Sequence, residues 1–83
     1  MIYEAHDAHF FLSVAYFPNA PYHFELMDLR SPNRWDLTLN TVIAEGDYTV
    51  ATLQSFLDRI PHEAQHLVFG FLKKAQKNSH PYD

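Results

Sequence analysis

The spacing of apolar residues changes once along this 83-residue chain, and the change limits the folds open to it. Before Gly46, two segments, residues 22–26 and 35–40, have an apolar residue at every second position. After Gly46 apolar residues recur at every third or fourth position. The first spacing is typical of strands with one buried face and the second of amphipathic helices. Strands followed by helices predict an α+β fold, and the length predicts one domain, residues 1–83.

Three segments show the strand pattern. Residues 9–17 are rich in aromatic and β-branched side chains, and residues 22–29 alternate between apolar and polar ones. Residues 35–40 also alternate, and this third strand is expected to continue towards Ala44. Glu45-Gly46-Asp47 is expected to break it. Residues 1–8 are ambiguous. An extra edge strand there would make the antiparallel sheet four-stranded rather than three-stranded.

The second half of the chain predicts two helices. The first carries an apolar stripe, with Asp47 or Thr49 as its N-cap: Val50, Leu53, Phe56, Leu57 and Ile60. Pro61 ends this helix and starts the next, whose stripe is Leu67, Val68, Phe71, Leu72 and Ala75. We expect the two C-terminal helices to pack antiparallel on one face of the sheet, with residues 78–83 as a flexible tail.

The other face of the sheet is expected to be solvated and to suit a partner protein. It would present His23, Glu25, Met27, Asp36 and Thr38. Residues 1–50 contain seven acidic residues and two arginines, within a net charge of −4 for the chain. Such an acidic half repels phosphate, so it disfavours direct nucleic-acid binding and favours a basic protein surface as partner. A merely solubilising acidic surface is the alternative.

Composition excludes several kinds of site. The chain has no cysteine, which removes thiol nucleophiles and Cys-based zinc sites and favours a reducing compartment, the cytoplasm. No apolar run is long enough for a membrane span, and no signal-peptide pattern is present. Two glycines are too few for phosphate-binding loops. We therefore expect no cofactor and no enzymatic activity.

One motif points to an enzyme instead. His62-Glu63-Ala64-Gln65-His66 matches H-E-x-x-H, in which two imidazoles on one helix face bind zinc and the glutamate acts as general base. A catalytic zinc needs a third protein ligand, and none stands at a suitable downstream spacing; His80 is isolated in the tail. His6 and His9 do not have a spacing that is specific for a metal site. Because the third ligand is missing, we predict no metal ligand. A zinc-dependent hydrolase that uses His62, Glu63 and His66 is kept as the alternative function.

The order of elements, together with two local segments, resembles a small phage-encoded type I-F anti-CRISPR inhibitor. The segments are Ala8-His9 leading into Leu12-Ser13-Val14-Ala15-Tyr16, and Leu53-Gln54-Ser55-Phe56-Leu57 running to Ile60-Pro61. The H-E-x-x-H segment has no counterpart in that family. The resemblance implies a non-catalytic inhibitor that docks on the backbone subunits of a type I CRISPR surveillance complex and blocks target-DNA binding.

The same resemblance implies the binding residues. Members of the family use two tyrosines and a glutamate on the sheet face against lysines of the target. Tyr3 and Tyr16 stand at comparable spacing here, and the acid is Glu25 or Asp28. Tyr16 as an ordinary core or edge-strand aromatic residue is the alternative. A small structural or adaptor subunit, for example a homodimer that pairs sheet edges, is a third possible function.

Overall fold

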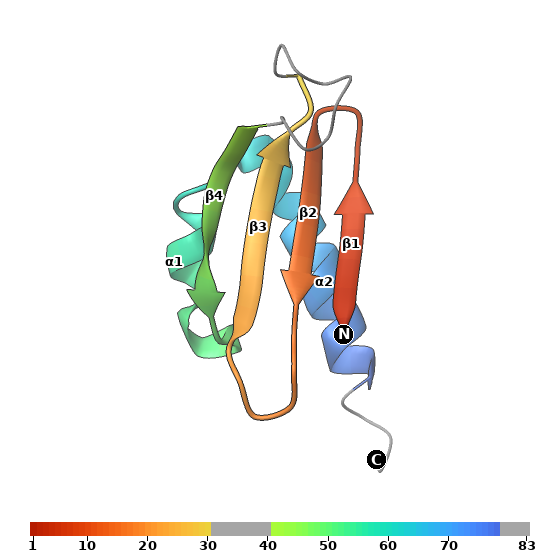
Figure 1. Cartoon of the computed structure of the whole chain (residues 1–83), viewed down its shortest axis with the longest axis vertical. Helices are drawn as coiled ribbons and strands as arrows, with labels where there is room; N and C mark the ends of the chain where they lie inside the picture. The colour runs from red at the N-terminus through yellow and green to blue at the C-terminus, as the bar shows by residue number, and fades with distance from the viewer. Residues whose placement is uncertain (31–40, 79–83) are drawn as a thin grey trace.

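A computed structural model describes residues 1–30 and 41–78 of the chain. Four strands form one antiparallel sheet in the order β1-β2-β3-β4, and helices follow them in the sequence (Figure 1). The strands are β1 (Ile2–His6), β2 (Phe10–Ala15), β3 (Tyr22–Asp28) and β4 (Thr41–Tyr48). The α+β class and the antiparallel sheet are confirmed, and the ambiguous first eight residues supply the edge strand β1.

The helical part comprises two 3₁₀ turns and two α-helices: η2 (Val50–Thr52), α1 (Leu53–Leu57), η3 (His62–Ala64) and α2 (Gln65–Asn78). Figure 1 shows α1 beside and behind β4, and α2 behind β1 and β2. Among the described residues, no helix is long and apolar enough to cross a membrane.

The core joins alternate residues of the strands to the apolar stripes of the helices. Phe24 of β3 contacts Phe56 of α1 and Phe71 of α2, with ring centroids 5.0 and 5.6 Å apart. Its neighbours on β3, His23 and Glu25, are only partly buried, so the predicted alternation on this strand is confirmed. The largest fully buried side chains are Phe10, Phe24, Phe56, Leu12, Leu26, Val14 and Val68.

The predicted strand break at Glu45-Gly46-Asp47 is wrong, because β4 continues through all three residues. Gly46 lies opposite Phe24, and a Cβ atom added to it would lie 2.9 Å from the ring of Tyr48. The Tyr48 ring therefore occupies the space beside Gly46, where it contacts the rings of Phe24 and Phe56. The glycine makes room for an aromatic ring instead of ending the strand. Residues 35–40 of the predicted strand lie outside the described residues.

The first predicted helix is shorter than its apolar spacing indicates. Of the two predicted N-cap residues, Asp47 and Thr49, the structure has Thr49 as the N-cap of η2. Thr49 forms a reciprocal capping box with Thr52. The turn that follows is 3₁₀, so the α-helix begins only at Leu53. Val50 consequently stays 60% exposed and lies outside the core, contrary to the prediction.

Two further sequence predictions concern residues outside the described ones. They are the place of Asp36 and Thr38 on the solvated face, and the flexibility of residues 79–83 of the tail. The predicted start of the tail at Asn78 is wrong, because Asn78 is the last residue of α2.

Candidate functional site

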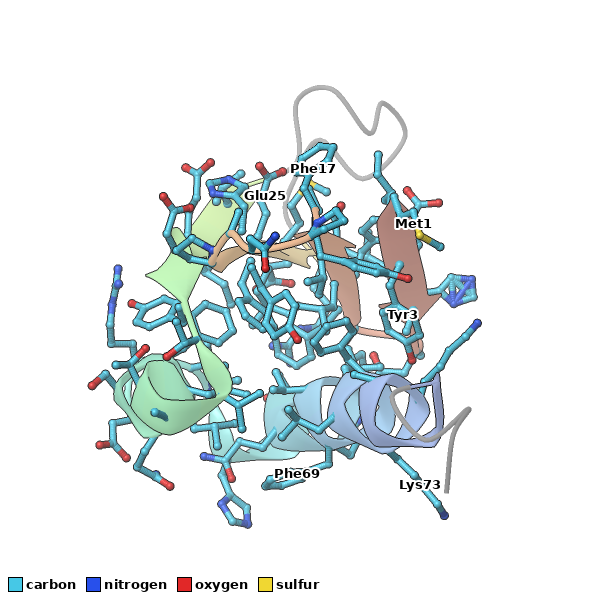
Figure 2. All side chains as sticks on the ribbon, turned by 90° about the horizontal axis from the view of Figure 1, so that it is seen from below. Met1, Tyr3, Phe17, Glu25, Phe69 and Lys73 are labelled. Carbon is cyan, nitrogen blue, oxygen red and sulfur yellow. The ribbon has the colours of Figure 1, made fainter. Side chains whose placement is uncertain are left out.

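Three glutamates lie in one line across the sheet, on the face opposite the core. Glu4 pairs with Ser13, Ser13 with Glu25, and Glu25 with Glu45. Residues paired in this way point to the same side of a sheet, and the neighbours of Ser13, Leu12 and Val14, are buried on the other side. We call Glu4, Glu25 and Glu45 the acidic row. Figure 2 shows Glu25 pointing away from the helices.

His23 lies beside the acidic row and interacts with two acidic residues of β4. Its Nδ1 is 2.6 Å from Oδ1 of Asp47, the residue directly opposite, and its Nε2 is 3.1 Å from Oε2 of Glu45. The ligand atoms of His23, Glu25 and Glu45 all lie within 4.8 Å of one another. We call these four residues the His23 cluster.

The acidic partners change the proton affinity of His23. The hydrogen bond to Asp47 raises the pKa of the imidazole above 6.5, and the bond to Glu45 adds to this, against the opposing effect of desolvation. Because the folded protein binds the His23 proton more tightly than the unfolded chain does, protonated His23 stabilises the fold below pH 6.5. This stabilisation is lost as the pH rises through the higher pKa that His23 has in the folded state. Because the His23 side chain is 44% exposed, solvent screening keeps the contribution small.

The His23 titration is a direct test of this arrangement. Asp47→Asn is expected to move the pKa of His23 towards 6.5, and by more than Glu45→Gln does, because Asp47 provides the strongest interaction. The measurement is an NMR titration of the His23 ring proton in buffer containing EDTA. Glu4→Gln, in the same row but outside the His23 cluster, is the control. Equal titration curves for Asp47→Asn and wild type would contradict the geometry.

The structure does not bring Tyr3 and Tyr16 together with Glu25. The Tyr3 ring lies 5.3 Å from that of Phe71 in α2, and the Tyr16 ring lies 5.9 Å from the same ring. Both tyrosines are partly buried against the core, and Figure 2 shows Tyr3 between the sheet and α2, on the side away from Glu25. The tyrosines and the glutamate therefore do not form one continuous surface, and the binding role of the tyrosines stays a prediction.

Asp28, the other acidic candidate, lies near the end of β3 and interacts with Arg30. Its Oδ1 accepts hydrogen bonds from the backbone N–H of Arg30 at 2.7 Å and from Nε of the same residue at 3.3 Å. The guanidinium of Arg30 also lies over the ring of Phe10, 4.9 Å from its centroid. Of the two candidates, only Glu25 belongs to the acidic row.

The H-E-x-x-H residues are divided between two elements. His62 and Glu63 lie in η3, and His66 lies in α2, so the motif does not occupy one continuous α-helix. Nε2 of His66 is 2.8 Å from Oδ2 of Asp7, and Glu63 is 3.5 Å from Nη2 of Arg30. Within residues 1–30 and 41–78, His23, Glu25 and Glu45 form a group of three residues whose donor atoms lie close enough together to share a metal ion. The zinc role of the H-E-x-x-H motif stays a prediction.

The sequence prediction missed Glu45 and Asp47 as site residues because it assigned them to a strand break. The signal was present in the alternation of small or aromatic residues with acidic ones: Ala44, Glu45, Gly46, Asp47, Tyr48. Alternation of inward-facing and outward-facing residues still indicates a strand when one inward-facing residue is glycine, provided that a neighbouring aromatic ring fills the space beside the glycine. The pairing of Glu45 and Asp47 with residues of β3 cannot be predicted from the sequence of either strand alone.

Comparisons with protein family models, with curated proteins and with solved structures find no match to this chain.

Proposed function

We propose that this chain is a non-catalytic protein-binding inhibitor or adaptor, and that its acidic sheet face docks on a basic protein surface. The observation that carries the proposal is the acidic row with Asp47 beside it. Carboxylates from three strands are held at fixed spacing on a rigid sheet. Preordered charges of one sign steer a partner of opposite sign and lose little entropy on binding.

The charge of the chain is divided between its elements. None of the four strands contains a lysine or arginine, whereas α2 contains Lys73, Lys74 and Lys77. We infer that the two helices pack antiparallel on one face of the sheet and leave the acidic face for the partner. Lys73 and Lys74 then lie away from the docking face and do not neutralise it.

Exposed apolar side chains adjoin the acidic face. Ile2 on β1 is 67% exposed and Val42 on β4 is 43% exposed, at the two edges of the sheet. Phe17 follows β2 and is 62% exposed, and Figure 2 shows it on the side of the sheet that carries Glu25. Apolar area beside polar groups is the composition of protein–protein interfaces. It supports docking over a purely solubilising role.

The backbone subunits of a type I CRISPR surveillance complex are the partner that the sequence resemblance proposes. Their lysines provide the basic surface that the acidic face would need. In this proposal Glu25 and its row supply the carboxylates, without Tyr3 and Tyr16 as direct neighbours. The proposal includes a cytoplasmic location, for which the absence of cysteine is the support.

Charge reversal at the centre of the face tests the docking. With purified type I surveillance complex as the probe, wild type is expected to co-elute with the complex and to block its binding of target DNA. Glu25→Lys is expected to weaken the association by at least about tenfold, since it places a cation against the partner's lysines. The readouts are co-elution and target-DNA binding at matched concentrations.

Asp58→Lys is the matched control. It makes the same charge change at the C-cap of α1, where a cation suits the helix dipole. It should inhibit like wild type. Equal loss of binding in both variants would contradict docking through the sheet face. Absence of co-elution of the wild-type chain would exclude this complex as the partner.

The structural-subunit alternative stays a prediction. Strands β1 and β4 are the edges of the sheet, so edge pairing would join two copies there. A dimeric mass by light scattering at micromolar concentration would favour it, and a monomeric mass would count against it.

A further inference from the structure

We infer that the His23 cluster binds one divalent transition-metal ion of the zinc class, through Nε2 of His23 and one carboxylate oxygen each from Glu25 and Glu45. The inference does not rest on the proposed docking function, because it concerns the isolated chain. It also places the metal on the sheet and not at the H-E-x-x-H motif.

The spacing of the three donors is the first support. A tetrahedral zinc site holds nitrogen and oxygen ligands about 2.0–2.2 Å from the ion, which puts neighbouring ligand atoms about 3.3 Å apart. Nε2 of His23 and Oε2 of Glu45 are 3.1 Å apart, and one donor atom from each of His23, Glu25 and Glu45 lies within 4.8 Å of the other two. A side-chain rotation at Glu25 completes the set, with the strands of the sheet unchanged.

The second ring nitrogen of His23 is the other support. Metal-binding histidines usually donate their remaining N–H to a carboxylate, which fixes the tautomer and turns the free nitrogen towards the ion. Oδ1 of Asp47 lies 2.6 Å from Nδ1 of His23 and supplies that carboxylate. In the neutral ring with Nδ1–H donated to Asp47, the lone pair of Nε2 faces the carboxylate of Glu45. A metal cation between them takes the place of the second ring proton.

The donor types select the class of metal. One imidazole nitrogen with two carboxylate oxygens suits Zn²⁺ and its neighbours in the first transition row, whereas Mg²⁺ and Ca²⁺ prefer oxygen alone. Glu25, Glu45 and Asp47 bring three negative charges, and the strands contain no lysine or arginine to offset them. Three protein ligands leave a fourth position for water.

The test is a calorimetric titration of ZnCl₂ into the untagged chain after EDTA treatment and buffer exchange. We expect one Zn²⁺ per chain with a dissociation constant in the micromolar range. His23→Gln, Glu45→Gln and Asp47→Asn should each weaken binding by at least about tenfold, the usual effect of losing a ligand or its carboxylate partner.

Two variants serve as matched controls. Glu4→Gln removes a carboxylate from the same row, and His62→Gln removes an imidazole from η3; both should keep the wild-type affinity. If His23→Gln binds Zn²⁺ like wild type, or if His62→Gln is the variant that loses binding, the assignment is wrong. Circular dichroism checks that each variant is folded.

With Co²⁺ and the wild-type chain, a paramagnetic shift of the His23 ring proton locates the ion without any substitution. An unshifted His23 proton would overturn the inference.

Discussion

Replacing Phe24 with alanine is expected to lower the free energy of unfolding by about 3–5 kcal/mol, the usual cost of removing a fully buried aromatic ring. Phe24 is 0% exposed, and its ring contacts those of Tyr22, Tyr48, Phe56 and Phe71. Alanine would leave the space between β3, β4 and the two helices, which the Phe24 ring occupies, unfilled. The measurement is urea denaturation followed by circular dichroism.

The Phe24 prediction needs a milder variant and a control, because a chain of this size has a total stability of only roughly 4–12 kcal/mol. Phe24→Leu keeps most of the apolar volume and should cost about 1–2 kcal/mol, so it stays folded and measurable. Phe17→Ala removes the same ring from an exposed position and should change stability by less than about 0.5 kcal/mol. A similar loss in Phe24→Ala and Phe17→Ala would contradict the core described above.

Asp7→Ala is expected to destabilise the protein by about 2 kcal/mol at pH 7, because one carboxylate joins two parts of the fold. Its Oδ1 accepts the backbone N–H groups of His9 and Phe10 at 2.7 and 2.8 Å, which shapes the turn between β1 and β2. Its Oδ2 is 2.8 Å from Nε2 of His66 in α2. The substitution loosens the hairpin and its link to α2.

The contribution of Asp7 depends on pH. Desolvation by itself would raise the pKa of this carboxyl, but the hydrogen bonds from His9, His66 and Phe10 together lower the pKa to about 2, from 3.8. A lowered pKa stabilises the folded state above pH 3.8, and this stabilisation is lost as the pH falls towards 2. With the side chain 31% exposed, we expect on the order of 1–2 kcal/mol after screening.

Urea denaturation of wild type and Asp7→Asn between pH 2 and pH 6 measures this contribution. The difference in stability should be largest above about pH 4 and should shrink as the pH falls to 2, because wild-type Asp7 then becomes neutral as well. Glu4→Gln, which removes a carboxylate from the exposed edge strand, should retain the pH dependence of wild type. A difference between wild type and Asp7→Asn that stays constant with pH would contradict the role assigned to Asp7.

Much of the local structure was predictable from the sequence because it follows from patterns within a few residues. The alternation through Tyr22, Phe24 and Leu26 gave the buried face of β3, and Thr49 gave the cap of η2. The prediction failed at Gly46, where a strand was read as a break. The ring that occupies the glycine's empty space comes from Tyr48, two residues away, and packs against another strand. Composition alone carries no information about that packing.

The sequence by itself determined that strands precede helices, that the first half is acidic and that α2 has an apolar stripe, since each depends on local spacing or on residue counts. Only the tertiary structure decided which acids meet. Register places Asp47 opposite His23 and Glu45 opposite Glu25, and the fold brings His66 to Asp7 across 59 positions. Packing against Phe71 separates the tyrosines from those acids. A period of two fixes the face of each residue but not its neighbour on the next strand, because register is set by non-local pairing and by the irregularity at Leu26/Met27.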